Sequence, residues 1–330
     1  MKRTTAFFCL LLAVLLFCSC GSESPAASES TAPSEAISEE ESVQTSEPSE
    51  ESEPVSEETA KEPIPDGAKV VTNLDYTNTG KMGDNDGPAY CVYSKVGHNK
   101  ASMDIAVSKI RINTVRKDGK FVNAYLFLGC DVYEGVSWCN CFDAGLCYSG
   151  RTPAWHLFYN IYEPAEEGEK KWFESNVKLD AAHDYRLILD TSEESQRATI
   201  VIWDITEDKK ADEATFSVKK MQKSGANTAY LMDFALDFPA DIRKDRSGNS
   251  TDDWGEITLF NTDEGLYMQN ILVSNVKIGA SGKEYEWDET RSSHRSLWPD
   301  KTVSVVDYAC TKVIGEAYDH DFRVDLDMNR

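Results

Sequence analysis

The chain has little positive charge. Its 330 residues carry 34 lysines and arginines against 57 aspartates and glutamates, a formal net charge of −23. Binding to nucleic acid requires a basic patch that neutralises phosphates, and the sequence contains none. The composition therefore argues against nucleic acid as a partner.

Familiar enzyme motifs are also missing. The sequence contains no Gly-x-Ser-x-Gly, no His-Glu-x-x-His and no phosphate-binding loop. The five histidines are scattered without the spacing of metal ligands, so zinc is not expected. Nucleophilic hydrolysis and zinc-protease chemistry thus lose their usual support in the sequence.

Long apolar runs are absent except at the N-terminus. Lys2 and Arg3 precede an apolar stretch from Ala6 to Phe17, which is shorter than the ~20 residues of a membrane span and is typical of a signal peptide. Ser19 followed by Cys20 resembles the lipobox of bacterial lipoproteins. This resemblance implies that residues 1–20 are a lipoprotein signal peptide and that Cys20 carries the lipid anchor. The alternative is an ordinary signal peptide cut nearby.

The next segment, residues 21–64, has no aromatic residue. It holds thirteen glutamates, eleven serines and five prolines against a single lysine. Such a composition cannot bury enough apolar surface to offset the entropy of ordering the chain. We expect a disordered acidic tether that holds the following domain away from an extracytoplasmic membrane surface.

Helical periodicity is scarce in residues 65–330, and alternation at period two is common. Strands are predicted at 124–133, 155–162, 185–190, 199–205, 230–238, 256–260 and 271–278. Many evenly spaced strands separated by Gly, Asp, Asn and Ser are typical of an antiparallel sandwich. We predict one all-β domain over 65–330.

Three of these segments carry a family resemblance. Residues 185–190 (YRLILD), 198–204 (ATIVIWD) and 266–278 (LYMQNILVSNVKI) resemble, in this order, the concanavalin A-like lectin/glucanase (LamG-like) family. The resemblance spans roughly residues 70–280 and implies a jelly-roll sandwich whose concave sheet binds or cleaves saccharides. Residues 281–330 are left for an added hairpin or for edge strands.

Aromatic residues cluster where a saccharide groove would need them. Ten of the 41 residues from Tyr133 to Phe173 are Phe, Trp or Tyr, against 10% of the whole chain. Flat rings stack on the apolar face of a sugar, while its hydroxyls bond to polar side chains. The candidate saccharide-binding residues lie on the half-polar faces of the predicted strands: Tyr125, Asp131, Tyr133, His156, Asn160, Tyr162, Asp233 and Asp237. The alternative is an ordinary amphipathic sheet, because strands favour aromatics.

Catalysis has less support than binding. Laminarinase-type members of the family carry Glu-x-Asp-x-x-Glu, and the nearest approach here, Glu286-Trp287-Asp288, ends at Arg291. We therefore expect a lectin-like lipoprotein that binds polysaccharide or cell-wall glycan, with no catalytic residues assigned. A hydrolase or lyase with an unrecognised catalytic pair, and a module that binds protein or cell wall, remain alternatives.

A calcium loop is the one metal hypothesis. Asp245, Asn249, Asp253 and Glu256 fall at ligand positions 1, 5, 9 and 12 of a calcium-binding loop, with Ser250 where such loops have glycine. The alternative is a polar turn between strands.

Six cysteines lie within residues 65–330, and none forms a metal-binding or redox pattern. An even number outside the cytoplasm permits disulfides, in any of fifteen pairings, and we treat these cysteines as structural.

Overall fold

The alternation in the sequence becomes strands that belong to two sheets. The structure, a computed structural model, describes residues 63–78, 87–245, 247–251, 264–301, 309–315 and 321–329. Predictions for Cys20, for nearly all of the tether, for the strand at 256–260, and for Asp253 and Glu256 lie outside the described residues. The described residues belong to one compact unit, Glu58–Arg330.

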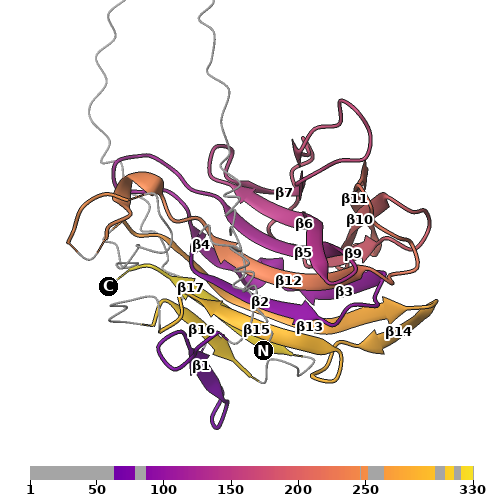
Figure 1. Ribbon diagram of the computed structural model, residues 1–330. Helices are drawn as coiled ribbons and strands as arrows, with labels where there is room; N and C mark the ends of the chain where they lie inside the picture. Colours follow the sequence, from indigo (N-terminus) through magenta and orange to yellow (C-terminus); the bar gives the residue numbers. More distant parts are fainter. Residues whose placement is uncertain are drawn as a thin grey trace, which may run out of the picture. The chain divides into compact units, whose positions relative to one another are not determined.

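One sheet has seven strands among the described residues, in the order β15-β2-β12-β5-β6-β7-β8, and every pair is antiparallel. Figure 1 shows it extending from β7 at the top towards β15. Its strands are β2 (Ala89–Ser94), β5 (Ala124–Glu134), β6 (Ser137–Ser149), β7 (Ala154–Ile161), β8 (Trp172–Glu174), β12 (Thr228–Leu236) and β15 (Ser292–Trp298).

The second sheet has ten strands within the described ranges. Its main path is β1-β16-β17-β13-β3-β9-β10-β11, and β4 and β14 also pair with β13. The strands are β1 (Val70–Thr72), β3 (Lys100–Ile105), β4 (Arg111–Asn113), β9 (Tyr185–Asp190), β10 (Arg197–Asp204), β11 (Lys209–Ser217), β13 (Tyr267–Ala280), β14 (Lys283–Glu286), β16 (Thr311–Ile314) and β17 (Phe322–Asp327). The prediction of an all-β antiparallel sandwich is confirmed.

Helical structure in the described part of the chain is limited to two short 3-10 turns, η1 (Val107–Lys109) and η2 (Ala240–Ile242). None of the described residues forms a helix with the length and apolar content that a membrane span requires.

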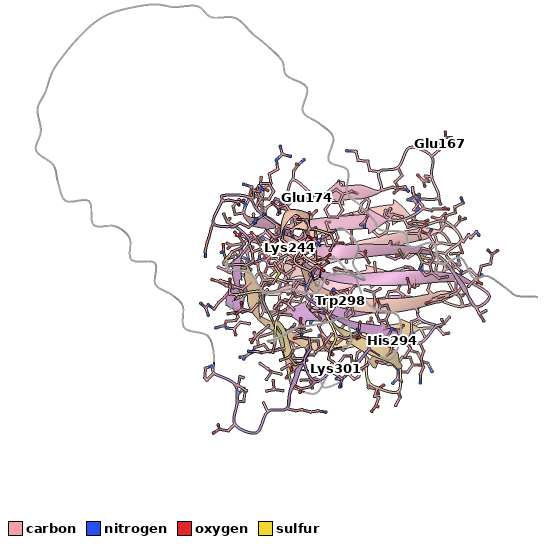
Figure 2. The ribbon with its side chains drawn as sticks, turned by 60° about the vertical axis from the view of Figure 1, so that its left-hand side comes forward. Glu167, Glu174, Lys244, His294, Trp298 and Lys301 are labelled. Carbon is pink, nitrogen blue, oxygen red and sulfur yellow. The ribbon has the colours of Figure 1, made fainter. Side chains whose placement is uncertain are left out.

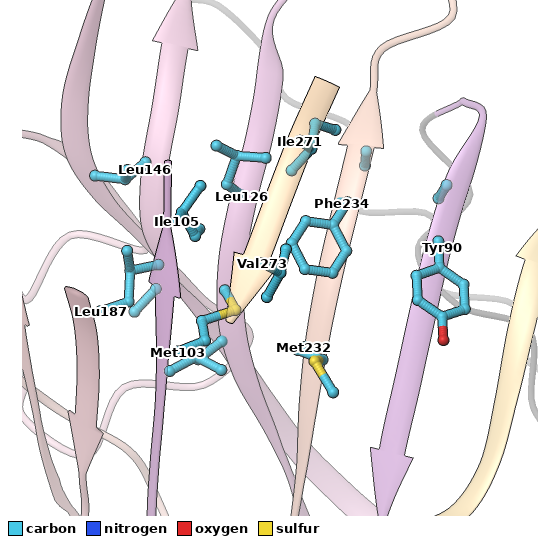
Figure 3. Close-up of a cluster of buried hydrophobic side chains, with 14 of the residues drawn as sticks. Tyr90, Met103, Ile105, Leu126, Leu146, Leu187, Met232, Phe234, Ile271 and Val273 are labelled. Atoms are coloured by element: carbon cyan, nitrogen blue, oxygen red, sulfur yellow. The ribbon is translucent and has the colours of Figure 1, made fainter. Parts of the chain in front are cut away.

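The core lies between the two sheets. The apolar face of β5, with Leu126 and Leu128 at its centre, is fully buried there, and so are Leu157 of β7 and Met232 of β12. Figure 3 shows side chains from both sheets meeting in this layer.

The last fifty residues contribute to both sheets. β14 forms a hairpin with β13, β15 is the edge strand of the seven-stranded sheet, and β17 pairs with β13 inside the ten-stranded sheet. The described residues after 280 are therefore integral parts of both sheets. β1, near the start of the described chain, also pairs with one of their strands, β16.

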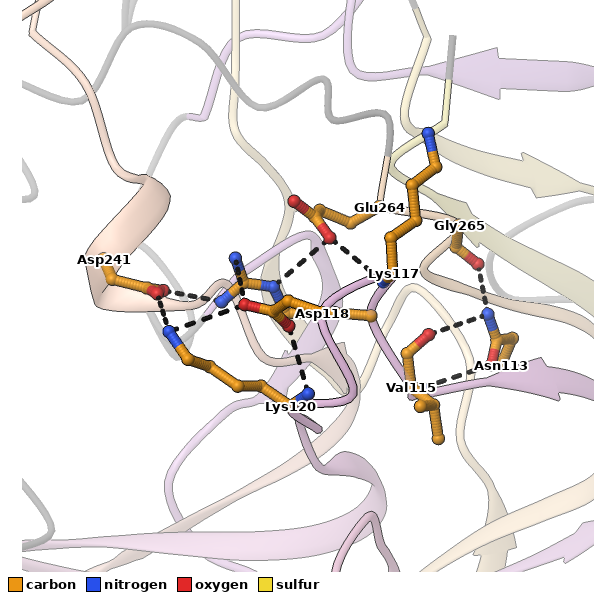
Figure 4. A network of polar contacts seen from close by, with 9 residues as sticks. Asn113, Val115, Lys117, Asp118, Lys120, Asp241, Glu264 and Gly265 are labelled. Carbon is orange, nitrogen blue, oxygen red and sulfur yellow. Dashed lines mark hydrogen bonds and ion pairs between the residues drawn. The ribbon is translucent and has the colours of Figure 1, made fainter.

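Arg116 ties three loops together at one end of the sandwich. Its guanidinium is almost fully buried, with Nη1 2.7 Å from Asp241 Oδ1, Nη2 3.6 Å from Asp118 Oδ2 and Nε 3.5 Å from Glu264 Oε2. Lys120 Nζ donates a 2.7 Å hydrogen bond to Asp241. Figure 4 shows the network, which joins the β4–β5 loop to η2 and to the segment before β13. The hydrogen bond from Lys120 and the contact with Arg116 lower the pKa of Asp241, although burial acts in the opposite direction.

Candidate functional site

The strand register places the candidate saccharide-binding residues on one surface. We call it the outer face, the side of the seven-stranded sheet that points away from the ten-stranded sheet. Tyr125 and His156 both pair with Cys147 of β6, so their side chains share this face. The remaining candidates lie on the same face of β5, β7 and β12 or directly after these strands: Asp131, Tyr133, Asn160, Tyr162, Asp233 and Asp237. Figure 2 marks the two edges of the sheet with Glu174 of β8 and His294 of β15.

The part of the outer face formed by β5 to β8 carries an aromatic cluster. Phe127 and Phe158 both pair with Gly145, and their rings meet edge to face with centroids 5.9 Å apart. A Cβ at Gly145 would lie within 3 Å of the backbone of β5 and of Phe127, so no larger residue fits. Trp172 stacks on Phe158 at 5.4 Å, and Tyr125 packs against both rings. Because Trp172 is 40% exposed, it is the member of the cluster that a ligand can reach.

A second aromatic group lies at the β5–β6 turn. Trp138 and Tyr162 have ring centroids 5.3 Å apart, and Lys171 Nζ lies 5.6 Å from the Tyr162 centroid. Asp131 accepts hydrogen bonds from Trp138 Nε1 at 2.9 Å and from the Tyr133 hydroxyl at 3.3 Å. Asp131 therefore orients both rings, while Trp138 remains 37% exposed. Burial and the nearby Asp131 carboxylate raise the pKa of Tyr133, which stays a neutral donor.

Asn160 lies between these two groups. It pairs with Trp172 on β8 and with Asp143 on β6. Its side-chain amide forms no hydrogen bond with the described residues. With strands ~4.8 Å apart and a rise of ~3.3 Å per residue, the Cα atoms of Trp172 and Tyr162 are roughly 8 Å apart. The side-chain amide of Asn160 therefore lies between the two aromatic groups, each of which includes one exposed tryptophan.

Besides Asp131 and Tyr133, further predicted residues have structural partners. His156 is buried, with Nδ1 2.9 Å from the Ser175 carbonyl oxygen. Asp237 accepts hydrogen bonds from the Asn123 amide at 3.1 Å and from the Tyr125 hydroxyl at 3.4 Å. Asp233 is fully buried and accepts a hydrogen bond from the Cys91 thiol. These groups shape the face from below, whereas Asn160 and Tyr162 reach its surface.

The candidates from the sequence do not include the two exposed tryptophans. Trp138 and Trp172 both fall in the aromatic-rich segment from Tyr133 to Phe173. This enrichment is the one feature of the sequence that indicates a place for them in the site. Half of that cluster serves the core instead: Phe142 and Tyr159, for example, both pack on Phe216 of β11.

The proposed calcium loop has two of its four ligands within the described residues. Asp245 Oδ1 accepts 2.8 Å hydrogen bonds from the amides of Ser247 and Asn249, and the Asn249 side chain donates to Oδ2. These bonds lower the pKa of Asp245. This part of the loop is a polar turn in which Asp245 caps the backbone, and calcium binding stays a prediction.

A different group of side chains, of the types that can hold a metal ion, lies where the turn before β9 meets the β10–β11 turn. His183, Asp204 and Glu207 place ligand atoms within 4.8 Å of one another, with His183 Nδ1 2.7 Å from Asp204 Oδ2. The Glu207 amide also donates to Asp204, and Glu207 forms an ion pair with Lys209. The hydrogen bond to Asp204 raises the pKa of His183. His183 and Asp204 thus join the turn before β9 to the turn after β10, and we call this pair the clasp.

This clasp should make stability depend on pH. Since the folded pKa of His183 lies above its ordinary value of 6.5, its contribution is complete below that value and is lost as pH rises through the folded pKa. We expect the difference in thermal midpoint between the wild type and His183→Gln to be largest near pH ~5.5 and to shrink towards pH ~9. A difference that stays constant or grows with pH would show that His183 does not act as a charged partner of Asp204.

The six cysteines of the domain are free thiols. Burial raises the pKa values of Cys130 and Cys147 well above the ordinary value, so neither is a thiolate at neutral pH. Cys310 is buried as well, and its pKa is raised to about 12. These three thiols act as small core residues.

Comparison with known proteins gives no family. No family model matches the chain, and no curated protein matches it. Among solved structures, the CBM2 module of the evolved Dit protein of Lactobacillus casei BL23 phage J-1 is similar at 10% identity, with a TM-score of 0.26, over 47% of this chain and 56% of that one. Tailspike protein 2 of Escherichia coli O157:H7 bacteriophage CAB120 is similar at 11% identity, with a TM-score of 0.27, over 61% of this chain and 27% of that one. Similarities this distant carry no conclusion about function.

Proposed function

We propose that this protein is a carbohydrate-binding protein that takes saccharides on the outer face of its seven-stranded sheet. The observation that carries the proposal is the arrangement of two exposed tryptophans, Trp138 and Trp172, around the available amide of Asn160. Exposed rings beside a polar group suit a pyranose, which has an apolar face and hydroxyls at its edge. The resemblance to concanavalin A-like lectins agrees with this reading.

Three acids of the outer face are engaged by neighbouring groups. Hydrolysis of a glycoside needs two carboxylates that face the scissile bond. On this face Asp131, Asp233 and Asp237 each accept hydrogen bonds from neighbouring groups and hold those groups in place. We therefore assign them positioning roles.

The binding proposal is tested by titrating the purified protein with soluble glucans, mannans and peptidoglycan fragments. We expect saturable binding to at least one of these polymers, with oligosaccharides of several units binding more tightly than the monosaccharide because they reach both tryptophans. A protein that binds none of the three classes is not a carbohydrate-binding protein of this kind.

We also propose that the protein is displayed outside the cytoplasm on a lipid anchor at Cys20. The short apolar run and the Ser19-Cys20 junction support this proposal. Mass spectrometry of the membrane fraction should find a diacylglyceryl adduct on an N-terminal Cys20, and Cys20→Ala should release the protein from the membrane. Equal membrane attachment and processing of the variant would contradict the anchor.

A further inference from the structure

A separate pocket opens on the opposite side of the sandwich, on the face of the ten-stranded sheet that points away from the core. It measures about 110 Å³. Since one water occupies roughly 10–15 Å³ of such volume, the pocket has room for a small polyatomic group. Its lining comes from β3, β9, β13 and β14: Lys100, Ser102, Arg186, Ile188, Asn275, Lys277 and Glu284.

The charge of this pocket is opposite to that of the chain. Three cations and one carboxylate line it, although the protein as a whole carries −23. Lys100 Nζ is held 2.9 Å from Glu284, and Arg186 forms a bidentate pair with Asp104 at 2.5 and 2.8 Å. The Lys277 ammonium makes no hydrogen bond or direct ion pair with the described residues, although the Glu284 carboxylate attracts it and Glu286 stands opposite it across the β13–β14 pair. Among the three cations, Lys277 is therefore the one whose charged group has no direct contact with a carboxylate of the described residues.

Hydrogen-bond donors are also left over in the pocket. Ser102 is only 9% exposed, and its hydroxyl has no partner among the described residues. The pair with Asp104 uses Arg186 Nε and Nη2 and leaves the two N–H groups of Nη1 available. Ser102 and Lys277 stand directly opposite each other in the β3–β13 register, so their side chains leave the sheet side by side on the same face.

The guanidinium is held in place by more than one group. Asn275 lies at an irregularity of β13 with φ 51°, and its Nδ2 donates a 3.1 Å hydrogen bond to Asp104 Oδ2. Asp104 thus fixes Arg186 on one side and is itself fixed by Asn275 on the other. A preorganised guanidinium loses less conformational freedom when it binds an anion than a mobile one.

We propose that this pocket binds a small oxoanion, either a phosphate group or the carboxylate of an acidic sugar. Lys277 and Arg186 supply the charge, and Ser102 donates a hydrogen bond at the base of the pocket. The site is independent of the outer face of the seven-stranded sheet, because none of its residues lies on that sheet. The protein would then carry an anion site in addition to its proposed saccharide site.

Calorimetric titration of the purified protein at low salt, with sodium phosphate and sodium glucuronate in separate runs, tests the proposal. Lys277→Met removes a charged donor and should weaken binding roughly tenfold, and Ser102→Ala should weaken it roughly threefold. Glu284→Gln releases Lys100 from its ion pair and should tighten binding about threefold, an effect that a purely structural role would not produce. The matched control is Lys210→Met, an exposed lysine of β11 outside the pocket, which should bind like the wild type.

The two anions separate the possible sources. Binding of phosphate alone indicates a phosphorylated ligand, binding of glucuronate alone indicates an acidic sugar, and binding of both supports a general oxoanion site. If neither anion binds, or if Lys277→Met and Lys210→Met lose affinity equally, the pocket is not an anion site. Trp172→Ala should leave phosphate affinity unchanged, so the result does not depend on the saccharide proposal.

Discussion

Replacing Phe234 by alanine is expected to lower the free energy of unfolding by about 3–5 kcal/mol. Phe234 of β12 is fully buried and stacks on Tyr90 of β2 with ring centroids 6.3 Å apart. It also meets Phe322 of β17 edge to face at 5.9 Å, and Phe322 touches Tyr90 at the same distance. This trio joins the two sheets, so truncation leaves a cavity in the layer that holds them together. Urea unfolding of the variant and the wild type measures the change.

Phe121→Ala is the matched control for this prediction. Phe121 lies in the loop before β5 and is 49% exposed. The same truncation there should cost well below ~1 kcal/mol, because little apolar surface leaves a packed environment. If Phe234→Ala cost no more than Phe121→Ala, the described packing between the sheets would be wrong at its centre.

Truncation of Trp172 is expected to weaken saccharide binding by about 1–3 kcal/mol, which is roughly 5- to 150-fold in affinity. Trp172 is the exposed member of the aromatic cluster and lies beside the available amide of Asn160. Its stacking partner Phe158 is buried and also packs against Phe127 over Gly145, so Phe158 keeps this contact when Trp172 is truncated. We therefore expect the variant to keep most of its stability while it loses affinity.

Trp203 offers the matched control for that variant. It lies on β10 of the ten-stranded sheet, where its Nε1 donates a 3.2 Å hydrogen bond to Asp208. Trp203→Ala removes a ring of the same size from a surface outside the proposed saccharide site. Its affinity for the glycan should equal that of the wild type.

The sequence predicts the strands whose two faces differ in polarity. β5, β7 and β9 show a clear alternation between core and outer residues, and the structure confirms them within one or two residues at each end. β6 gives no such contrast, because Phe142 and Leu146 on its inner face alternate with Asp143, Gly145 and Cys147, two of which are small and uncharged. Its position in the sheet follows only from pairing.

The sequence predicts on which side of its strand each candidate residue lies, but it does not predict which candidates are neighbours. Period-two alternation places Tyr125 and Asn160 on the outer side of their strands, yet it does not show that Trp172 of the three-residue β8 pairs with Asn160. The anion pocket could not be predicted from the sequence, because Ser102 and Lys277 are 175 positions apart and become neighbours only through the β3–β13 register. Long-range pairing of this kind is not encoded in local periodicity.

The most direct test of the saccharide site is one experiment on the double variant Trp138→Ala/Trp172→Ala. Affinity for the best glycan ligand of the wild type and the thermal midpoint are measured side by side. We predict that the variant unfolds close to the wild type, since both rings are more than a third exposed, and that its glycan binding falls below detection. A folded double variant that binds the glycan as tightly as the wild type would contradict the assignment of the outer face as the saccharide site.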